Sequence, residues 1–243
     1  MTTGPVLLWR RLTAEFLGSA FLAAVVIGSG IAAQRLSPGQ TGLQLLENAA
    51  ATAAGLYAII LMFGPVSGGH FNPVVSFVDA AFGGLSWRDA TAYLPAQVAG
   101  CFAGAVAANL MFALPAVTIS ARHRASPAHF LSEIIATLGL LLVIFALARS
   151  GRARSAPAAV GAYIGAAYFF TSSTSFANPA ITIGRMFSDT FAGGQFGVDQ
   201  RAQLRVDGRQ HLGQLLHLRH RQAADGQRVG HLQADVPGPD DHR

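Results

Sequence analysis

The sequence predicts an all-α membrane protein with five membrane-spanning helices and two shorter helices that enter the membrane without crossing it. Three observations lead to this fold class. The 243-residue chain is 51% hydrophobic and only 12% charged, whereas a typical soluble domain carries about 25% charged residues. Its apolar residues are gathered into long segments. An Asn-Pro motif also occurs twice, each time after a similar succession of segments.

Five segments are apolar enough to cross a membrane, which takes roughly 20 residues of helix. They are rich in Gly, Ala and Ser, which let helices approach closely in lipid. The third contains Pro95 and Pro115, which neighbouring helices can accommodate. The intervals 34–42, 120–128 and 149–155 are polar or rich in Pro and Gly and are predicted as loops. The predicted spans are Leu12–Ala33, Asn48–Val66, Ala90–Val117, Phe130–Ala148 and Ala156–Phe170, the last with a Ser/Thr continuation.

Two stretches, 67–84 and 171–194, fit neither a span nor a loop. Each begins with small polar residues, reaches Asn-Pro and continues as a short amphipathic run that ends at Gly-Gly. Asn as the N-cap followed by Pro is a helix-start signal. From Asn72 to Gly83 there are 11 residue-to-residue steps, which give about 16 Å of helix, half the thickness of a bilayer. Both stretches are therefore predicted to be re-entrant.

The order of these segments repeats along the chain. The first half has Glu15 in an apolar helix, a second helix and then Asn72; the second half has Glu133, another helix and then Asn178. An odd number of spans in each half would place the two halves in opposite orientations. Inverted repeats with discontinuous helices that meet near the midplane are typical of a transport pathway.

The stretches SGGHFNPVVS and FANPA, with a Glu in the first apolar helix of each half, resemble the aquaporin (major intrinsic protein) family. The resemblance covers about residues 8–194, which form the predicted channel domain. It implies an aquaporin-like inverted repeat, a homotetramer in the lipid bilayer, and passive conduction of water, glycerol-like polyols or undissociated arsenous acid. It implies neither enzymatic activity nor a cofactor.

The two Asn-Pro motifs are the predicted centre of the pore. Two helix N-termini that face each other at mid-membrane create a positive potential, which repels cations and protons but not neutral solutes. The resemblance implies that each Asn caps its helix and donates hydrogen bonds to the solute. It also implies that Glu15 and Glu133 brace the re-entrant loops by accepting backbone hydrogen bonds, since ionisable groups at this depth need internal partners. The motifs are Asn72-Pro73-Val74 and Asn178-Pro179-Ala180.

The selectivity constriction is predicted by ungapped counting from the two Asn residues. Ile181 stands where water-selective members of the family carry Arg, and Ala166 stands where they carry His; Arg185 lies one turn further on. The predicted ring is wide, weakly polar and uncharged, so it should pass solutes larger than water. It consists of Thr52, Ala166, Ser175 and Ile181.

Orientation follows from the arginines that flank the spans. With the N-terminus inside, six arginines lie on the inner side and three on the outer side. This count predicts a cytoplasmic N-terminus in a plasma or inner membrane. The inner set is Arg10, Arg11, Arg88, Arg149, Arg152 and Arg154, and the outer set is Arg35, Arg122 and Arg124.

Several other functions are disfavoured. The net charge is +5, but the arginines lie at segment ends and in the tail, with no basic groove interleaved with aromatic residues for nucleic acid. His123 and His129 lack metal-ligand spacing, so no metal site is predicted. His70 is interpreted as a hydrogen-bonded loop residue rather than a pH gate. Cys101, the only cysteine, excludes an intrachain disulfide and is interpreted as a small packing residue.

Two alternative functions remain open. A secondary transporter would also use inverted repeats, but it needs coupling carboxylates, and only Glu15 and Glu133 are available for that role. Dependence of transport on a proton gradient would distinguish the two. The other alternative is a non-functional channel remnant, because of the unusual composition of the C-terminal segment.

Residues 195–243 form a polar tail where the family pattern demands a sixth span. The tail holds seven Arg, six Asp and five of the eight His, and no apolar run longer than two residues, so it cannot span lipid. The abrupt change in composition suggests a frameshift near codon 194, either in the gene or in its sequencing. We expect a pore wall open on one side, an unstable or inactive chain and a disordered tail. A His-rich metal-binding tail is a weaker alternative.

Overall fold

The computed structural model describes residues 6–121 and 126–190, and within them it is entirely helical, without strands. This confirms the predicted fold class. The predicted tail, residues 195–243, lies outside the described residues. The helices are α1 (Leu8–Leu36), α2 (Thr41–Ser67), α3 (Pro73–Ala81), α4 (Trp87–Met111), α5 (Pro127–Arg149), the 3₁₀ helix η1 (Ala153–Ser155), α6 (Ala156–Phe170) and α7 (Pro179–Arg185).

Four of the five predicted spans are long and apolar enough to cross a membrane: α1, α2, α4 and α5. The fifth, α6, has the predicted bounds, but its 15 residues give about 22 Å of helix, short of a full hydrocarbon core. The helix η1 directly precedes it. The two halves therefore do not have spans of equal length.

Two predicted helices end earlier than expected, and α2 begins at Thr41 rather than at the predicted Asn48. The third span was expected to reach Val117, but α4 ends at Met111. Ala113 then adopts a left-handed φ of 57°, and Pro115 disfavours a helical conformation in the residue before it. The second re-entrant stretch was expected to be helical up to its Gly-Gly. Its helix α7 instead has only seven residues and ends at Arg185, so it is shorter than the nine-residue α3.

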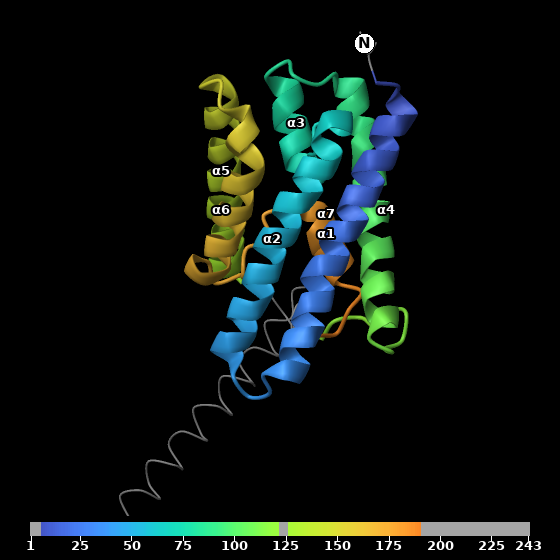
Figure 1. Ribbon diagram of the computed structural model, residues 1–243, viewed down its shortest axis with the longest axis vertical. Coiled ribbons are helices and arrows are strands. Elements are labelled where there is room, and N and C mark those ends of the chain that lie inside the picture. Colours follow the sequence, from blue (N-terminus) through green and yellow to red (C-terminus); the bar gives the residue numbers. More distant parts are fainter. Residues whose placement is uncertain (1–5, 122–125, 191–243) are drawn as a thin grey trace, which may run out of the picture. The chain divides into compact units, whose positions relative to one another are not determined.

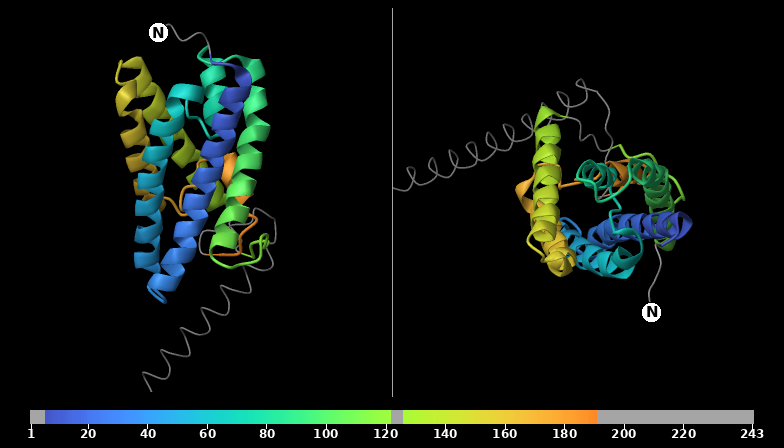
Figure 2. Two further views of the ribbon diagram at one scale, coloured as in Figure 1. Left: turned by 45° about the vertical axis from the view of Figure 1, so that its right-hand side comes forward. Right: turned by 90° about the horizontal axis from the view of Figure 1, so that it is seen from above.

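The long helices form an open arc around the two short ones. Neighbours along the arc contact each other in the order α4, α1, α2, α6 and α5, and α7 packs against α4, α1 and α3. Figure 2 shows this arc from above, with α3 and α7 on its inner side. In Figure 1, α1 begins at the end where α3 joins α4 and α5 joins α6. The arc thus encloses the two Asn-Pro helices.

Small residues set the closest approach within this arc. Gly100 and Gly104 of α4 lie so near α1 that a Cβ on either would clash with the carbonyl oxygen of Phe16 or Ala20. In lipid there is no hydrophobic driving force for helices to associate, so close van der Waals packing of this kind stabilises the contact. The packing of α1 against α4 therefore depends on these two glycines.

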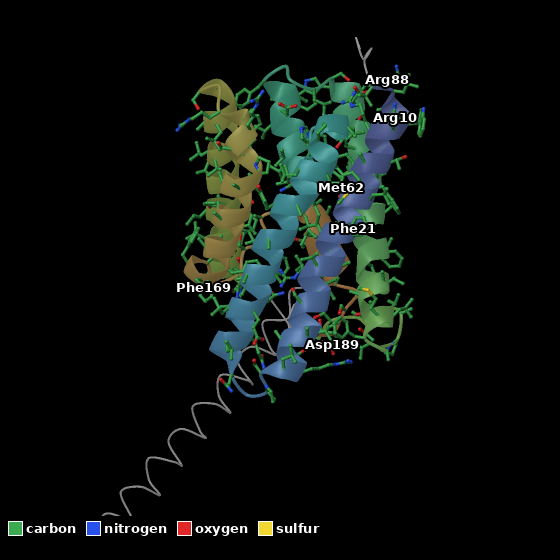
Figure 3. The ribbon with its side chains drawn as sticks, viewed as in Figure 1. Arg10, Phe21, Met62, Arg88, Phe169 and Asp189 are labelled. Atoms are coloured by element: carbon green, nitrogen blue, oxygen red, sulfur yellow. The ribbon has the colours of Figure 1, made fainter. Side chains whose placement is uncertain are left out.

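The exterior of the helices is apolar along their length. Phe21, Met62 and Phe169 are 50%, 58% and 54% exposed, and Figure 3 shows them on three different helices. Arg10 and Arg88 lie at one end of the bundle and Asp189 at the other (Figure 3). Such a surface, apolar between charged ends, fits a protein embedded in a bilayer.

Candidate solute pathway

Each short helix begins at an Asn that caps it. The Oδ1 atom of Asn72 accepts a hydrogen bond from the Val74 N–H at 3.0 Å. In α7, Oδ1 of Asn178 accepts from the N–H groups of Ala180 and Ile181 at 3.0 and 3.4 Å. Because Pro follows each Asn and has no N–H, the cap satisfies the first donors that the helix has.

The two caps also hold each other. The Nδ2 atom of Asn72 donates to the carbonyl of Ala177 at 2.7 Å, and Nδ2 of Asn178 donates to the carbonyl of Phe71 at 2.7 Å. These reciprocal bonds bring the N-termini of α3 and α7 together from opposite halves of the sequence. Each amide has two hydrogens, and each of these bonds uses one of them.

Glu15 and Glu133 hold the loops that lead into the two caps. Glu15 accepts from the backbone N–H groups of His70 and Phe71 at 3.0 and 2.7 Å. In the same way, Glu133 accepts from Phe176 and Ala177 at 2.9 and 2.6 Å.

The loop backbone needs this support. Phe71 and Ala177 have left-handed φ values of 48° and 47°, a conformation that costs roughly 1–3 kcal/mol each outside glycine. The carboxylates therefore offset local strain. Glu15 has two further donors, Ser67 Oγ at 2.6 Å and Gln97 Nε2 at 2.8 Å.

A cavity of about 150 Å³ lies beside the paired caps. Residues of α1, α2, α5, α6, both re-entrant loops and both short helices line it, including Asn72 and Asn178. No residue of α4 is part of this lining. Both halves of the repeat thus contribute to one pathway, and the helix that completes the first half lies outside it.

Three of the four predicted constriction residues lie in this lining: Thr52, Ser175 and Ile181. Ala166 does not. It is exposed on α6 and absent from the lining, which instead takes Ile164 and Tyr168 from that helix. Two residues turn a helix by about 200°, so Ala166 faces away from the cavity.

On α6, Tyr168 lines the cavity and Ala166 does not. The Tyr168 hydroxyl lies 3.1 Å from Oγ1 of Thr52, so these two residues of the lining are in contact. Val160, Ile164 and Tyr168 are spaced four apart, so they lie on one face of the helix. This spacing indicates the cavity-facing side of α6, which ungapped counting did not use.

The lining of the cavity also contains a charged residue outside the predicted ring. Arg185 lines the cavity with only 2% of its surface exposed. Its Cζ atom lies 3.7 Å from the ring centroid of Phe176, a cation–π contact. Ser175 lines the cavity, and its buried Oγ has no hydrogen-bond partner among the described residues.

At the other short helix, His70 and Asp79 line the same cavity. The Nδ1 atom of His70 lies 3.0 Å from Ser76 Oγ, and its Nε2 atom lies 3.6 Å from Asp79 Oδ2. The sequence interpretation of a hydrogen-bonded histidine fits these contacts. Asp79 was overlooked, although it is the only acidic residue in the re-entrant stretch 67–84.

Two half-membrane helices from inverted repeats, capped by paired Asn residues beside a cavity, define an inverted-repeat membrane channel. The chain belongs to the Major intrinsic protein family, which it matches over residues 3–191. The match ends four residues before the polar tail begins.

Known relatives agree with this assignment. The chain is 49% identical over 186 residues to aquaglyceroporin AqpS of Rhizobium meliloti (strain 1021), covering 76% of this chain and 79% of AqpS. It is 34% identical over 184 residues to aquaporin NIP1-4 of Oryza sativa subsp. japonica, covering 72% and 65%. It is 32% identical over 158 residues to aquaporin-9 of Rattus norvegicus, covering 57% of this chain and 53% of that relative.

Among solved structures, the X-ray structure of the aquaglyceroporin from Plasmodium falciparum has the same fold. The TM-score is 0.61 at 23% sequence identity, and the match covers 73% of this chain and 79% of that one. This likeness supports the architecture described above.

Proposed function

We propose that this chain is a passive channel for small uncharged solutes of the size of glycerol, and for water. The observation that carries this proposal is the cavity beside the reciprocally bonded Asn72 and Asn178, lined by both halves of the repeat. Each Asn would donate its second amide hydrogen to a solute oxygen. The 49% identity to AqpS, an aquaglyceroporin by name, supports the same solute class.

The electrostatics of the lining favour neutral solutes. The N-termini of α3 and α7 meet at the paired caps, and each carries about half a positive charge. Arg185 adds a full positive charge to the lining. Asp79, the one acidic residue in the lining, lies beside His70. A cation would therefore meet a barrier at the caps, whereas a neutral molecule would not.

The chemistry of the constriction suits a polyol. Hydroxyl groups of Thr52, Tyr168 and Ser175 would exchange hydrogen bonds with the solute, while Ile181 would contact its carbon atoms. Water has no carbon atoms and would gain nothing from the contact with Ile181, so this contact favours a polyol. Undissociated arsenous acid is also small, neutral and rich in hydroxyls, and we propose it as a second solute.

The remaining expectations belong to the same proposal. We infer a homotetramer in the plasma or inner membrane, with the end that carries Arg10 and Arg88 (Figure 3) in the cytoplasm. Protease protection of an N-terminal tag in oriented vesicles tests the orientation. Light scattering coupled to gel filtration in detergent tests the oligomeric state.

A coupled transporter is the competing function, and the roles of Glu15 and Glu133 count against it, although Asp79 also lies in the lining. Coupling would need a carboxylate that gains and loses a proton or ion during transport. Glu15 and Glu133 each accept two backbone hydrogen bonds, which hold them as structural acceptors. A remnant with no function is favoured only by the composition of the tail.

Uptake into proteoliposomes separates these functions. Vesicles with the chain should take up glycerol and arsenite down their gradients, at rates unchanged when a proton gradient is imposed or collapsed by a protonophore. Protein-free vesicles provide the background. Uptake that follows the proton gradient would identify a transporter, and uptake at background rates by inserted, folded protein would identify a remnant.

A further inference from the structure

His70 and Asp79 of the first re-entrant segment lie close together in the cavity lining without a hydrogen bond between them. The distance from Nε2 of His70 to Oδ2 of Asp79 is 3.6 Å, too long for a direct hydrogen bond. Within the described part of the chain, no other group donates a hydrogen bond to the Asp79 carboxylate. An ionisable group at membrane depth needs such partners, and a molecule in the pathway can supply them here.

The hydrogen bonds of Ser76 assign the proton on the His70 ring. A serine hydroxyl has one hydrogen and two acceptor lone pairs. Ser76 donates its hydrogen to the carbonyl of Asn72 at 3.2 Å, and its Oγ atom accepts from Nε2 of Gln97 at 3.1 Å. In the remaining contact, Nδ1 of His70 lies 3.0 Å from the same Oγ atom, so Nδ1 is the donor. In a neutral imidazole, Nε2 is then an acceptor.

The surroundings hold both acceptors in position. The His70 ring packs edge-on against Tyr93 with the ring centroids 5.7 Å apart, and the backbone N–H of His70 donates to Glu15 at 3.0 Å. The Asp79 carboxylate lies against Gly84, where an added Cβ would clash with all three of its atoms. The missing side chain of Gly84 thus leaves the space that the carboxylate occupies. Two fixed acceptors, Nε2 and Oδ2, therefore border the cavity side by side.

This pair is separate from the constriction residues described above. Asp79 comes seven residues after Asn72, which is about 10 Å along α3, toward the end where α3 joins α4 (Figure 1). Tyr168, which contacts Thr52, precedes Phe169, and Phe169 lies toward the opposite end (Figure 3). A solute would therefore meet the two sets of groups at different points of its path.

We propose that His70 and Asp79 bind two adjacent hydroxyl groups of a polyol as it crosses the channel, which rests on the passive conduction proposed above. One hydroxyl donates to Nε2 of His70 and the other to Oδ2 of Asp79. Hydroxyls on neighbouring carbon atoms suit two acceptors that lie 3.6 Å apart, and the charge of the carboxylate strengthens the second bond. Asp79 is thereby a specificity-determining residue for vicinal diols.

Permeability to two diols of the same formula tests this site. Proteoliposomes that contain the full chain are mixed at about pH 8 with a gradient of 1,2-propanediol or 1,3-propanediol, and the protein-free rate is subtracted. The chain should pass the 1,2-diol at least about twofold faster, because the 1,3-diol must fix one more rotatable bond to reach both acceptors. Equal rates would overturn the site but leave the channel standing. Protein-free rates for both diols would instead contradict the proposed function.

Matched variants locate the preference. In Asp79→Asn, the new amide donates to the histidine ring itself, so the ratio of the two diol rates should fall to about one. Asp89→Asn makes the same change outside the lining and should keep the ratio. Gly84→Ala displaces the carboxylate and should also lower the ratio, whereas Gly42→Ala, which meets nothing within 4 Å, should not. Unfolding midpoints show that each variant folds. An unchanged ratio in Asp79→Asn or Gly84→Ala would overturn the proposal.

NMR of the histidine rings gives a readout that does not depend on conduction. The full chain is labelled with ¹⁵N in histidine and embedded in lipid at about pH 8, and the loss of signals in His70→Gln assigns those of His70. We expect a proton on Nδ1 and none on Nε2, and 1,2-propanediol should shift the Nε2 signal more than 1,3-propanediol does. A proton on Nε2 without diol, or equal shifts with the two diols, would overturn the proposal.

Discussion

At the scale of single residues, Ile181 and Ala166 provide a matched test of the constriction. Ile181 lines the cavity, whereas Ala166 lies on the other side of α6. Ile181→Arg should lower glycerol permeability at least about tenfold, which needs only about 1.4 kcal/mol of added barrier, and should affect water less, because water is smaller. Stopped-flow light scattering of proteoliposomes measures both rates.

Ala166→His is the control for this experiment, since it adds a large polar side chain outside the lining of the cavity. It should leave the glycerol rate within about twofold of the unaltered chain. Equal effects of the two substitutions would show that the constriction is not where the cavity places it.

Asn178 tests the ion barrier at the paired caps. In Asn178→Asp, a carboxylate oxygen replaces the Nδ2 donor, which lies 2.7 Å from the Phe71 carbonyl oxygen. The two oxygens repel each other, and the substitution adds a buried negative charge. The variant should either unfold at lower temperature or leak cations, since an uncompensated buried charge costs several kcal/mol. Thermal unfolding and potassium flux measure the two outcomes. A stable variant that still excludes cations would contradict the dipole argument.

At the scale of structural elements, the two carboxylates stabilise the re-entrant loops. In Glu15→Gln or Glu133→Gln, an amide NH₂ group replaces one acceptor and faces a backbone N–H. Each loss of an acceptor for a buried donor costs about 1–3 kcal/mol. Both variants should therefore unfold at lower temperature, and Glu15→Gln should lose more, because Glu15 also accepts from Ser67 and Gln97. Unchanged unfolding midpoints would show that the loops hold without these bonds.

Glycine positions give a second test at this scale. Gly104→Ala places a Cβ against the Ala20 carbonyl, so it should push α4 from α1 and lower the unfolding midpoint. The control, Gly64→Ala, meets nothing within 4 Å and should be neutral or stabilising, because Ala is the better helix former by about 1 kcal/mol. A midpoint for Gly104→Ala as high as that of Gly64→Ala would refute the close packing.

Local signals predicted the elements well, and their ends and faces less well. Asn-Pro located the start of both short helices, since capping depends on adjacent residues alone. Ala166 lies outside the lining of the cavity, and the count that led to it crosses residues 171–177, where Thr174, Ser175 and Ala177 are left-handed. A change of two residues in the count reverses the face of a helix. Arg185 was seen in the sequence, but its burial in the cavity depends on the packing of α7.

At the scale of the whole molecule, the lining of the cavity bears on the expectation of a missing sixth span. An open pore wall was expected if that span is missing. The cavity is instead lined by α1, α2, α5, α6 and the re-entrant segments, without α4. By the symmetry of the repeat, the counterpart of α4 would also lie outside the lining. We therefore expect that a missing sixth span mainly lowers the stability of the fold, because it leaves a face of α5 uncovered. We expect it to have less effect on the lining of the pathway.

Glycerol permeability of the 243-residue chain tests the central claim most directly. Proteoliposomes that contain the chain are mixed rapidly with a glycerol gradient, and light scattering follows shrinkage and then reswelling as the solute enters. We expect reswelling faster than in protein-free vesicles, and slowed by Ile181→Arg but not by Ala166→His. Folded, inserted protein that speeds water efflux but leaves glycerol entry at the protein-free rate would contradict a channel for glycerol-sized solutes.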